Sequence, residues 1–487
     1  MVSHALVRFG AFTLDPQRHV LTRDGADVAL SPHLVDILTY LASHSGELVT
    51  KDVLLDCFWS GIHISDNTLT RAMADIRKAL GDDASTPTFI QTVARRGYRF
   101  IAALEATHST VERDPFRDWV RGRYSLESLD AAQLPSAVVA FEHAALTAPD
   151  YAPAHVGLAN AYFLQFECTR ATNTPDRAPL ERALSHARHA CALDPALGEA
   201  WATLGLILAG AAHPEDASAA ARRAAALEPT SWRHHFRLGI ATWGEERLRA
   251  SDRTLALFPD FAPARFLAAM VFTARQAYAP AMQAAAGAAT QARQAGLEGV
   301  PFPSIGLHWL HGLLLLREGR LGPAIVAFAR EIDETHQPRV YATEFRVNAQ
   351  VGAGFAHLAA ADPAGASDAF RAALATLPGN GRALLGLHQA LMHTSLASEA
   401  PRLLSHVDRA IAELVAGGRP GEAALITAAS QAVRGDVEGA CTTLRRLLEV
   451  APAGQTGWQI PIDPALATLR ATPPYDDVAA MLAARAS

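Results

Sequence analysis

Residues 65–83 (SDNTLTRAMADIRKALGDD) combine side chains that can bind nucleic acid with a regular apolar spacing. In a helix, the four apolar residues at i, i+4, i+7 and i+11 share one face and bury it; they are Leu69, Met73, Ile76 and Leu80. The other side presents short polar side chains, one small residue and cations: Asn67, Thr70, Arg71, Ala74, Arg77 and Lys78. Such a face suits the major groove of DNA, with an ordinary solvated face as the alternative.

A second basic stretch follows in FIQTVARRGYRFIA (89–102), where residues typical of strands lie on both sides of Arg96-Gly97. The predicted hairpin carries Arg95, Arg96 and Arg99 near its tip, and guanidinium groups bind phosphates or enter a narrow minor groove. Residues 1–66 hold four Lys/Arg against eight Asp/Glu, whereas residues 67–100 hold six against three, so the net charges are −4 and +3. The positive charge is therefore concentrated on the proposed DNA side.

Other patterns that could support chemistry are weak. No phosphate-binding P-loop and no G-x-S-x-G motif occurs, and we expect the glycines of VGAGFA (351–356) to serve helix packing. His308 and His311 could share one helical face, but no further ligand lies at metal-binding spacing, which favours histidines of a core. The four cysteines are far apart and are expected to be buried thiols in a reducing compartment: Cys57, Cys168, Cys191 and Cys441. We expect neither catalysis nor a cofactor nor a metal.

The basic residues need a scaffold, and the surrounding sequence predicts one. Residues 31–46 form a predicted helix with Ser31 as its cap and Pro32 in its first turn, and residues 50–59 form a second with Thr50 as its cap. The helix over 65–83 then has Ser65 as its cap and Gly81 as its stop. Two helices with a brief connection are typical of a helix-turn-helix. Residues 5–30 alternate around Pro16 and Asp24-Gly25 and predict a small antiparallel sheet.

This order of sheet, three helices and hairpin, with ISDNTLTRAMADIRKALGD and TVARRGYRF, resembles the OmpR/PhoB-type winged-helix DNA-binding domain over about residues 5–104. The resemblance implies recognition-helix positions for Asn67, Thr70, Arg71, Ala74 and Arg77, and a wing that carries Arg95, Arg96 and Arg99. It also implies that the loop FWSGIHIS can touch RNA polymerase. The chain departs from the pattern at Ala74 and Asp75, which interrupt the basic face and bear on the base sequence and the affinity.

The same resemblance suggests how binding is controlled. Many relatives have a receiver domain before the winged helix, and here only about four residues precede it, so we do not expect control by aspartyl phosphorylation. The first 104 residues sum to about −1, so sequence-independent affinity should be modest and sensitive to salt. Pairing in a homodimer would strengthen binding.

The rest of the chain repeats. The stretches ALDP and ALEP end at Pro195 and Pro229, 34 residues apart, with WATLGLIL (201–208) and spaced alanines between them. Similar small residues and Phe or Leu recur in phase, so the region resembles a tetratricopeptide (TPR)-type α-solenoid. The repeat is irregular near 165–180 and 275–303, where Pro, Gly and polar residues predict insertions or broken helices.

A solenoid of helix pairs has a groove that binds peptides or protein segments. Two sets of residues have the phase to line it, although aromatic residues at these positions can equally fill the cores between repeats. The sets are Arg233, Phe236, Ile240 and Trp243, and Trp309, Leu313 and Leu316.

The predicted organisation is therefore mainly α: a winged-helix DNA-binding domain (1–104), a linker (105–117), a TPR-like solenoid (118–455) and a C-terminal cap or tail (456–487). The N-terminus MVSHALVRFG lacks the pattern of a secretory signal, and no window of about twenty uncharged apolar residues predicts a membrane span. We expect a cytoplasmic regulator that binds double-stranded promoter DNA and receives a signal through a protein partner or self-association. The alternative is a protein-interaction scaffold whose winged helix has little DNA affinity, and a hidden catalytic site in the solenoid is a third possibility.

Overall fold

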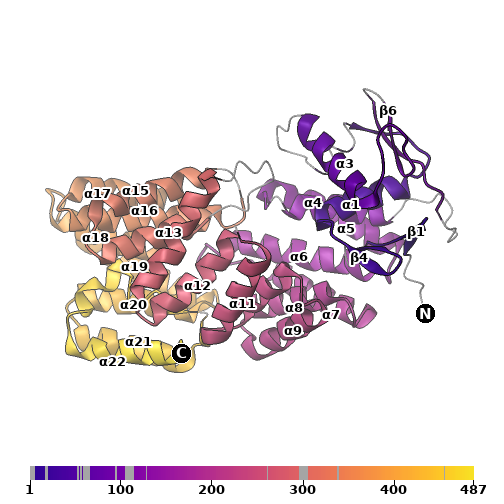
Figure 1. Cartoon of the computed structure of the whole chain (residues 1–487). Helices are drawn as coiled ribbons and strands as arrows, with labels where there is room; N and C mark the ends of the chain where they lie inside the picture. Colours follow the sequence, from indigo (N-terminus) through magenta and orange to yellow (C-terminus); the bar gives the residue numbers. More distant parts are fainter. Residues whose placement is uncertain are drawn as a thin grey trace. The chain divides into compact units, whose positions relative to one another are not determined.

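The computed structural model describes residues 6–16, 20–51, 54, 58, 66–93, 96–104, 115–127, 129–259, 261–294, 305–336, 339–454 and 456–487. They divide into two compact units (Figure 1). The first consists of Met1–Leu129, Gln133–Leu158 and Ala192–Leu197, and the second of Asp130–Ala132, Ala159–Cys191 and Gly198–Ser487.

The first unit begins with an antiparallel sheet whose strands follow the chain order. The strands are β1 (Val7–Phe9), β2 (Phe12–Asp15), β3 (Val20–Arg23) and β4 (Ala26–Val28). Asp24 and Gly25 form the two-residue turn between β3 and β4, and both have positive φ, at 50° and 83°. Such a turn matches the twist of the strands that it joins, which is why Asp-Gly is favoured there. The predicted sheet is confirmed.

The helices and a second sheet complete this domain. They are α1 (Pro32–Ser43), α3 (Asp66–Leu80), β5 (Val49–Thr50), β6 (Ile90–Val93) and β7 (Gly97–Phe100), with the strands in the order β5-β7-β6. Ser31 caps α1 by accepting a hydrogen bond from the N–H of Leu34 at 3.4 Å, as predicted.

Thr50 is the last residue of β5, where it pairs with Gly97, and it directly precedes the helical residue Lys51. It therefore lies at the position predicted for the cap, and the extended backbone of a strand is compatible with that role. The sequence did not predict the strand, which is short and completes the sheet of the hairpin. Of the predicted helix over 50–59, Lys51, Leu54 and Phe58 are helical, and the other residues up to Ser65 lie outside the described residues.

A cluster of aromatic rings fills the core between the two sheets. Phe9 packs edge-on against Phe100 with ring centroids 5.1 Å apart, and Phe12 packs edge-on against Phe89 at 5.4 Å. Phe9 and Phe100 are fully buried. Since Phe89 and Phe100 flank the hairpin, these contacts hold its base on the N-terminal sheet.

Helices of the first unit continue with α4 (Pro115–Glu127), α5 (Leu134–Thr147) and the first turns of α6 (Ala152–Thr169). The first of them begins at Pro115, three residues before the predicted start of the solenoid at 118. The ring of Phe141 lies against Gly122 and Gly157, where an added Cβ would come within 2.8 Å and 2.2 Å of it. Glycine on the flanking helices thus makes room for phenylalanine on the middle one.

The second unit consists of helix pairs. Its helices after α6 are α7 (Ala178–Leu193), α8 (Gly198–Gly210), α9 (Pro214–Leu227), α10 (Trp232–Ala241), α11 (Gly244–Leu257), α12 (Ala262–Ala274), α13 (Tyr278–Gln294), α14 (Leu307–Arg317), α15 (Leu321–Glu334), α16 (Ala342–Ala359), α17 (Pro363–Thr376), α18 (Gly381–Met392), α19 (Ala400–Ala416), α20 (Pro420–Val433), α21 (Val437–Val450) and α22 (Pro473–Arg485). A short 3₁₀ helix, η2 (Pro464–Leu469), precedes the last one. The 34-residue unit predicted from Pro195 and Pro229 is the pair α8 and α9 (Figure 1).

Phenylalanines in glycine-lined sockets join successive pairs. Phe328 of α15 is fully buried between Gly312 and Gly352, where a Cβ would lie 2.6 Å and 2.4 Å from its ring. Phe370 of α17 lies in the same way between Gly354 and Gly386, at 2.6 Å and 2.2 Å. The glycines of VGAGFA therefore serve helix packing, as expected from the sequence.

Two expectations about the helical region need correction. Residues 278–294 form the continuous helix α13, so a broken helix, one of the two alternatives for 275–303, is wrong there, because the alanine-rich sequence favours helix over the effect of its single Gly and Pro. Residues 295–303 lie outside the described residues. Cys168 is exposed, whereas Cys191 and Cys441 are buried as expected. The neighbours of Cys168 in α6, Phe166 and Glu167, are buried, so Cys168 lies at the edge of the buried face of the helix. Cys57 lies outside the described residues.

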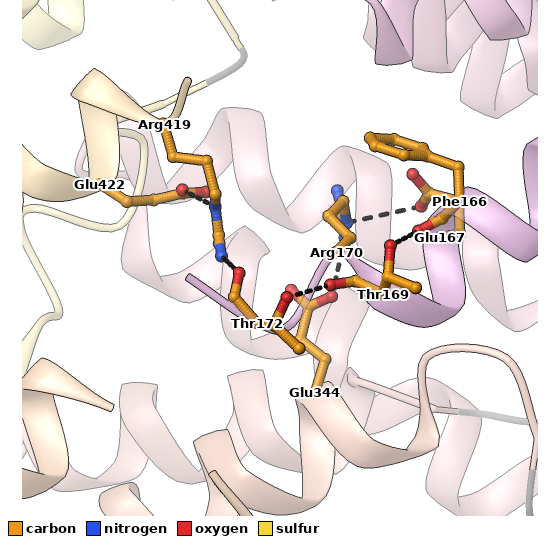
Figure 2. Close-up of polar contacts among 8 residues, drawn as sticks. All are labelled: Phe166, Glu167, Thr169, Arg170, Thr172, Glu344, Arg419 and Glu422. Carbon is orange, nitrogen blue, oxygen red and sulfur yellow. Dashed lines mark hydrogen bonds and ion pairs between the residues drawn. The ribbon is translucent and has the colours of Figure 1, made fainter. Parts of the chain in front are cut away.

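The connection between α6 and α7 touches helices that come much later in the chain (Figure 2). Arg170 Nη2 lies 2.9 Å from Glu344 Oε2, and Arg170 Nε lies 3.5 Å from Glu167 Oε2. Asn173 donates from Nδ2 to Gly379 O at 3.0 Å and to Glu413 Oε2 at 2.9 Å, and Arg419 donates to the carbonyl of Thr172. These contacts join the α6–α7 connection to the later helices of the solenoid. The paired residues are 174 to 247 positions apart in the sequence.

None of the helices that the structure describes combines the length and the apolar character that crossing a membrane requires.

Candidate nucleic-acid interface

The helix α3 has the two faces that its sequence predicts. Leu69, Met73, Ile76 and Leu80 are buried, with exposed fractions of 2 % or less. Gly81 follows with φ 67°, and the N–H of Asp82 donates to Arg77 O at 2.8 Å, which ends the helix as the sequence predicts. The predicted cap Ser65 lies outside the described residues.

On the opposite face, Thr70, Arg71, Ala74 and Lys78 are exposed. Asn67 belongs to the first turn of the helix, and its side chain lies outside the described residues. The face therefore combines two cations, a hydroxyl and a small side chain. Asp75 is exposed beside them and places one negative charge next to Ala74.

Arg77 is different, because its guanidinium group binds the neighbouring hairpin. Its Nη2 donates to Ile90 O at 2.9 Å and to Thr92 Oγ1 at 2.7 Å, and the group lies 5.8 Å from the ring centroid of Tyr98. The side chain is half-buried, and its Nε is buried with no hydrogen-bond partner in the described structure. Arg77 thus fixes α3 to β6, and fewer of its donors remain for a nucleic acid than the sequence indicates.

The predicted hairpin consists of β6 and β7, which pair from Ile90↔Phe100 to Val93↔Gly97. At its turn, Arg96 is exposed and its N–H donates to Val93 O at 3.0 Å, while Arg99 is half-buried in β7. Arg95 lies outside the described residues. Gly97 is required by close packing, since an added Cβ would lie 1.9 Å from Val49 O of the paired strand.

Asp82, which the sequence analysis did not single out, connects the end of α3 to the start of the hairpin. Its carboxylate accepts hydrogen bonds from the N–H groups of Thr88, Phe89 and Ile90, at 2.6, 3.2 and 2.8 Å. The signal in the sequence was the Gly-Asp pair after the helix, where aspartate commonly binds nearby backbone N–H groups. Arg77 and Asp82 therefore fix the position of α3 relative to the hairpin β6–β7.

The described residues contain no group of three or more His, Cys, Asp and Glu side chains that could hold a metal ion. His308 forms a hydrogen bond with Glu334 Oε1 at 2.9 Å and is 5 % exposed, so it is a core residue with one partner.

Residues 25–100 match the family described as "Transcriptional regulatory protein, C terminal". These residues form a transcriptional regulatory domain of that family. Transcriptional activator CadC of Escherichia coli is 34 % identical over 97 residues, which make up 20 % of this chain and 19 % of CadC. Transcriptional regulatory protein RstA of the same species is 31 % identical over 104 residues, which make up 20 % of this chain and 42 % of RstA.

A further relative is the cholera toxin transcriptional activator of Vibrio cholerae, which is 32 % identical over 108 residues, 21 % of this chain and 37 % of that protein. The chain thus spans between about a fifth and two fifths of the length of these relatives.

Two solved structures match different shares of the chain. The RstA DNA-binding domain of Klebsiella pneumoniae, solved in complex with the RstA box, is 35 % identical and covers 20 % of this chain and 98 % of that chain, with a TM-score of 0.19. A tetratricopeptide repeat protein of Parabacteroides merdae is 14 % identical and covers 56 % of this chain and 99 % of that chain, with a TM-score of 0.38.

Proposed function

We propose that the chain is a cytoplasmic regulator of transcription that binds double-stranded promoter DNA in a sequence-specific manner. In this proposal α3 enters the major groove, and the hairpin β6–β7 binds the backbone or the minor groove as a wing. The observation that carries it is the exposed basic face of α3, which Arg77 and Asp82 join to the hairpin. The residues proposed to contact DNA are Asn67, Thr70, Arg71, Ala74, Arg77, Lys78, Arg95, Arg96 and Arg99.

The contacts of Arg77 refine its role in this proposal. Since Arg77 already donates to Ile90 and Thr92, we assign it mainly to positioning the wing and leave phosphate binding to its remaining donors. Arg71, Lys78 and Arg96 are exposed and are the cations best placed to reach phosphates.

The helix pairs are proposed to receive the signal, through a protein or peptide partner or through self-association. A homodimer would place two winged helices on one stretch of DNA, and its affinity would exceed that of a single domain. Contact with RNA polymerase is a further part of the proposal. No cofactor and no catalysis are required.

A second candidate function is a protein-interaction scaffold with little DNA affinity. The observation that favours it is Asp75, which is exposed on α3 beside Ala74 and opposes the cations there. The dependence of binding on salt separates the two. A regulator should retain preference for one sequence while its affinity falls steeply with salt, whereas the scaffold should bind no duplex even at low salt.

The experiment begins with selection of bound sites from genomic DNA by the full chain, followed by mobility shifts on a selected site. Combined substitution of Arg71→Ala, Arg95→Ala and Arg96→Ala should lower affinity by at least about tenfold and reduce the salt slope by about 1 for each phosphate that the variant no longer neutralises. The matched control removes three exposed arginines from the helical region, Arg402→Ala, Arg409→Ala and Arg446→Ala.

The control changes net charge by the same amount and should leave affinity within about twofold, because its three arginines are not among the residues proposed to contact DNA and salt screens charges that do not touch the duplex. Equal affinity of the two triple variants for the selected site would show that the proposed face is wrong.

A further inference from the structure

The first helices of successive pairs form the inner layer of the solenoid. The helices α14, α16, α18 and α20 touch one another in that order, whereas the second helices between them make at most slight contacts with each other. Helices approach on the inside of a curved stack and separate on its outside, so these four line the concave face. The 3₁₀ helix η2 contacts all four of them.

The chain's own residues 456–470, which we name the C-terminal arm, therefore cover the concave face. The indole of Trp458 packs edge-on against Trp309 of α14 and Phe266 of α12, with ring centroids 6.2 Å apart in both cases. Ile460, Ile462 and Leu466 are at most 1 % exposed. The sequence allowed Trp309 either to line a groove or to fill a core. In the structure it is buried at the contact between α14 and the arm.

A charged pair fixes the arm on this apolar surface. Asp463 is 5 % exposed, and its Oδ2 lies 3.0 Å from both Nε and Nη2 of Arg382 on α18. Arg470 Nη2 donates to the carbonyl of Asp463 at 2.6 Å. Burial of charge is costly, and an apolar pair of similar volume would stabilise the fold at least as well. A charged pair at this position instead favours recognition of one orientation and one kind of segment.

The C-terminal arm resembles a bound peptide, because it is a short segment with little regular structure. Its regular element is the 3₁₀ helix η2. It folds through tight turns, in which Ile460 N donates to Gly457 O at 3.0 Å and Ile462 N donates to Gln459 O at 2.9 Å. Gly454 and Gly457, with φ of 83° and 91°, lie at its start, where the chain leaves α21. These backbone bonds are local, whereas Trp458 and Asp463 bind residues of the helices that the arm covers.

We propose that the concave face lined by α14, α16, α18 and α20 is a binding site for a protein segment with the chemistry of the arm, and that such a segment binds by displacing it. The segment would carry an aromatic residue, two aliphatic residues and a carboxylate in the order of Trp458, Ile460, Ile462 and Asp463. The arm is thus an intramolecular competitor, and a tethered competitor acts at an effective concentration of about millimolar. The apparent affinity for the partner equals the affinity of the open face multiplied by the fraction of time for which the arm leaves that face open.

This inference rests on the partner-binding half of the proposed function and does not involve the DNA interface. The probe is a fluorescein-labelled synthetic peptide of residues 456–472, and binding to the full chain is measured by fluorescence anisotropy. The natural chain should bind it weakly, because its own arm competes. The chain with Trp458→Ala and Asp463→Ala should bind at least about tenfold more tightly, with one peptide for each chain.

Charge reversal tests the polar anchor. Arg382→Glu, added to the weakened arm, should abolish binding of the natural peptide, and a peptide with Asp463→Arg should restore it. Thr468→Ala is the matched control, since Thr468 is exposed on the arm and its loss should leave peptide affinity unchanged. Far-UV circular dichroism establishes that each variant is folded, and the milder Asp463→Asn variant replaces the double variant if the latter unfolds.

A folded variant that gains no affinity for the peptide overturns the proposal, as does failure of charge reversal to restore binding. A dimer of the weakened variant without gain in peptide affinity also overturns it, in favour of arm exchange between two copies. The assay contains no DNA, so a negative result here leaves the DNA interface untouched. Conversely, loss of the mobility shift would leave this proposal standing.

Discussion

At the scale of single residues, Arg77 shows how one side chain of a basic helix can have a structural task. Its sequence position faces the side that carries Arg71 and Lys78, yet its guanidinium group lies on β6 and beside Tyr98. A guanidinium group has five donors in a planar fork, so it can bind a carbonyl and a hydroxyl together, which a lysine cannot do with the same geometry.

Arg77→Ala should therefore destabilise the winged-helix domain by about 2 kcal/mol, because it removes two hydrogen bonds of a charged group to β6. Arg77→Lys should recover little of this loss. Hydrogen exchange of the β6 amides in the full chain measures the effect. Arg71→Ala is the comparison, since Arg71 is exposed and its loss should change protection by no more than about 0.5 kcal/mol. Equal protection of β6 in the two alanine variants would contradict the positioning role.

Glu331 is a second residue whose surroundings matter, because they change the pKa of its carboxyl group. It is fully buried and accepts hydrogen bonds from the N–H groups of Gly306 at 2.7 Å and Trp309 at 3.0 Å. Burial raises the pKa of its carboxyl group to about 7, against the lowering effects of the two N–H groups and of His308, while Glu334 acts in the same direction as burial. In the folded chain the protonated form of Glu331 is thus favoured below about pH 7.

The sign of the pH dependence follows from this. A raised pKa means that the stabilising contribution is complete below pH 4.5, the value in the unfolded chain, and is lost as pH rises through about 7. The loss should reach about 3 kcal/mol by pH 8. Glu331→Gln should show a lower but flatter stability between pH 5 and pH 8, measured by urea denaturation with Trp fluorescence.

Glu318→Gln serves as the control for this pH series, because the side chain of Glu318 is 41 % exposed and its loss should leave the slope as it is in the natural chain. A slope that Glu331→Gln does not reduce would mean that Glu331 is ionised in the folded protein at neutral pH.

At the scale of elements, the glycine sockets determine how closely helix pairs approach. Phe370→Ala should cost about 3–5 kcal/mol through the cavity that it leaves between α16 and α18. Gly386→Ala should cost about 1–3 kcal/mol, since its Cβ would lie 2.2 Å from the ring of Phe370.

The double variant Phe370→Leu with Gly386→Ala should be clearly more stable than the sum of its single variants implies, because the smaller side chain accepts the added methyl group. Urea denaturation monitored by circular dichroism measures this coupling. Additive effects would show that the ring and the glycine do not limit each other.

Sequence periodicity was sufficient for the elements that depend on local patterns. The apolar stripe of α3, its stop at Gly81 and the cap at Ser31 follow from spacing and backbone preference alone. The phase of the helix pairs also followed, since proline and small residues recur every repeat. The exposed basic face of α3 was predicted for the same reason.

Contacts between distant parts of the chain could not be predicted from sequence periodicity. The position of Thr50 before a helix could be predicted, but its pairing with Gly97 in a strand could not. Likewise, the bonds of Arg77 to β6 depend on the tertiary fold, and helical phase did not show them. The C-terminal arm was expected to be a cap or tail, because turns such as those at Ile460 have no period from which a binding face can be read.

At the scale of the whole second unit, a charged contact closes the solenoid at the α6–α7 connection (Figure 2). Two carboxylates, Glu167 at 5 % and Glu344 at 28 % side-chain exposure, share the guanidinium group of Arg170. Burial raises the pKa of Glu167, and the two carboxylates raise the pKa of Arg170. The cluster therefore has one negative charge in excess when all three groups are ionised.

Arg170→Met should loosen this closure, because it leaves the two carboxylates to repel each other. The loss should be about 1–3 kcal/mol at pH 8, a modest value because Arg170 itself is 42 % exposed. It should be smaller at acid pH, because burial raises the pKa of Glu167 and protonation of this carboxylate relieves the repulsion. Limited proteolysis of the connection at pH 8 and at acid pH measures it.

Adding Glu344→Gln to Arg170→Met is the matched control, since it removes one of the repelling charges and should recover part of the resistance. Equal cleavage of the natural chain and Arg170→Met at pH 8 would show that the contact does not close the solenoid.

The phenylalanine sockets have a consequence for how a chain of this type can change in length. Each ring is enclosed by glycines of two different helices, so a single inserted residue would turn one of those glycines away and bring a larger side chain against the ring. Duplication or loss of an entire helix pair instead presents each ring with the equivalent glycine of another pair, as Gly352 faces Phe328 and Gly386 faces Phe370. Growth by whole modules, rather than by gradual lengthening, is the route that this architecture leaves open to evolution and to protein engineering.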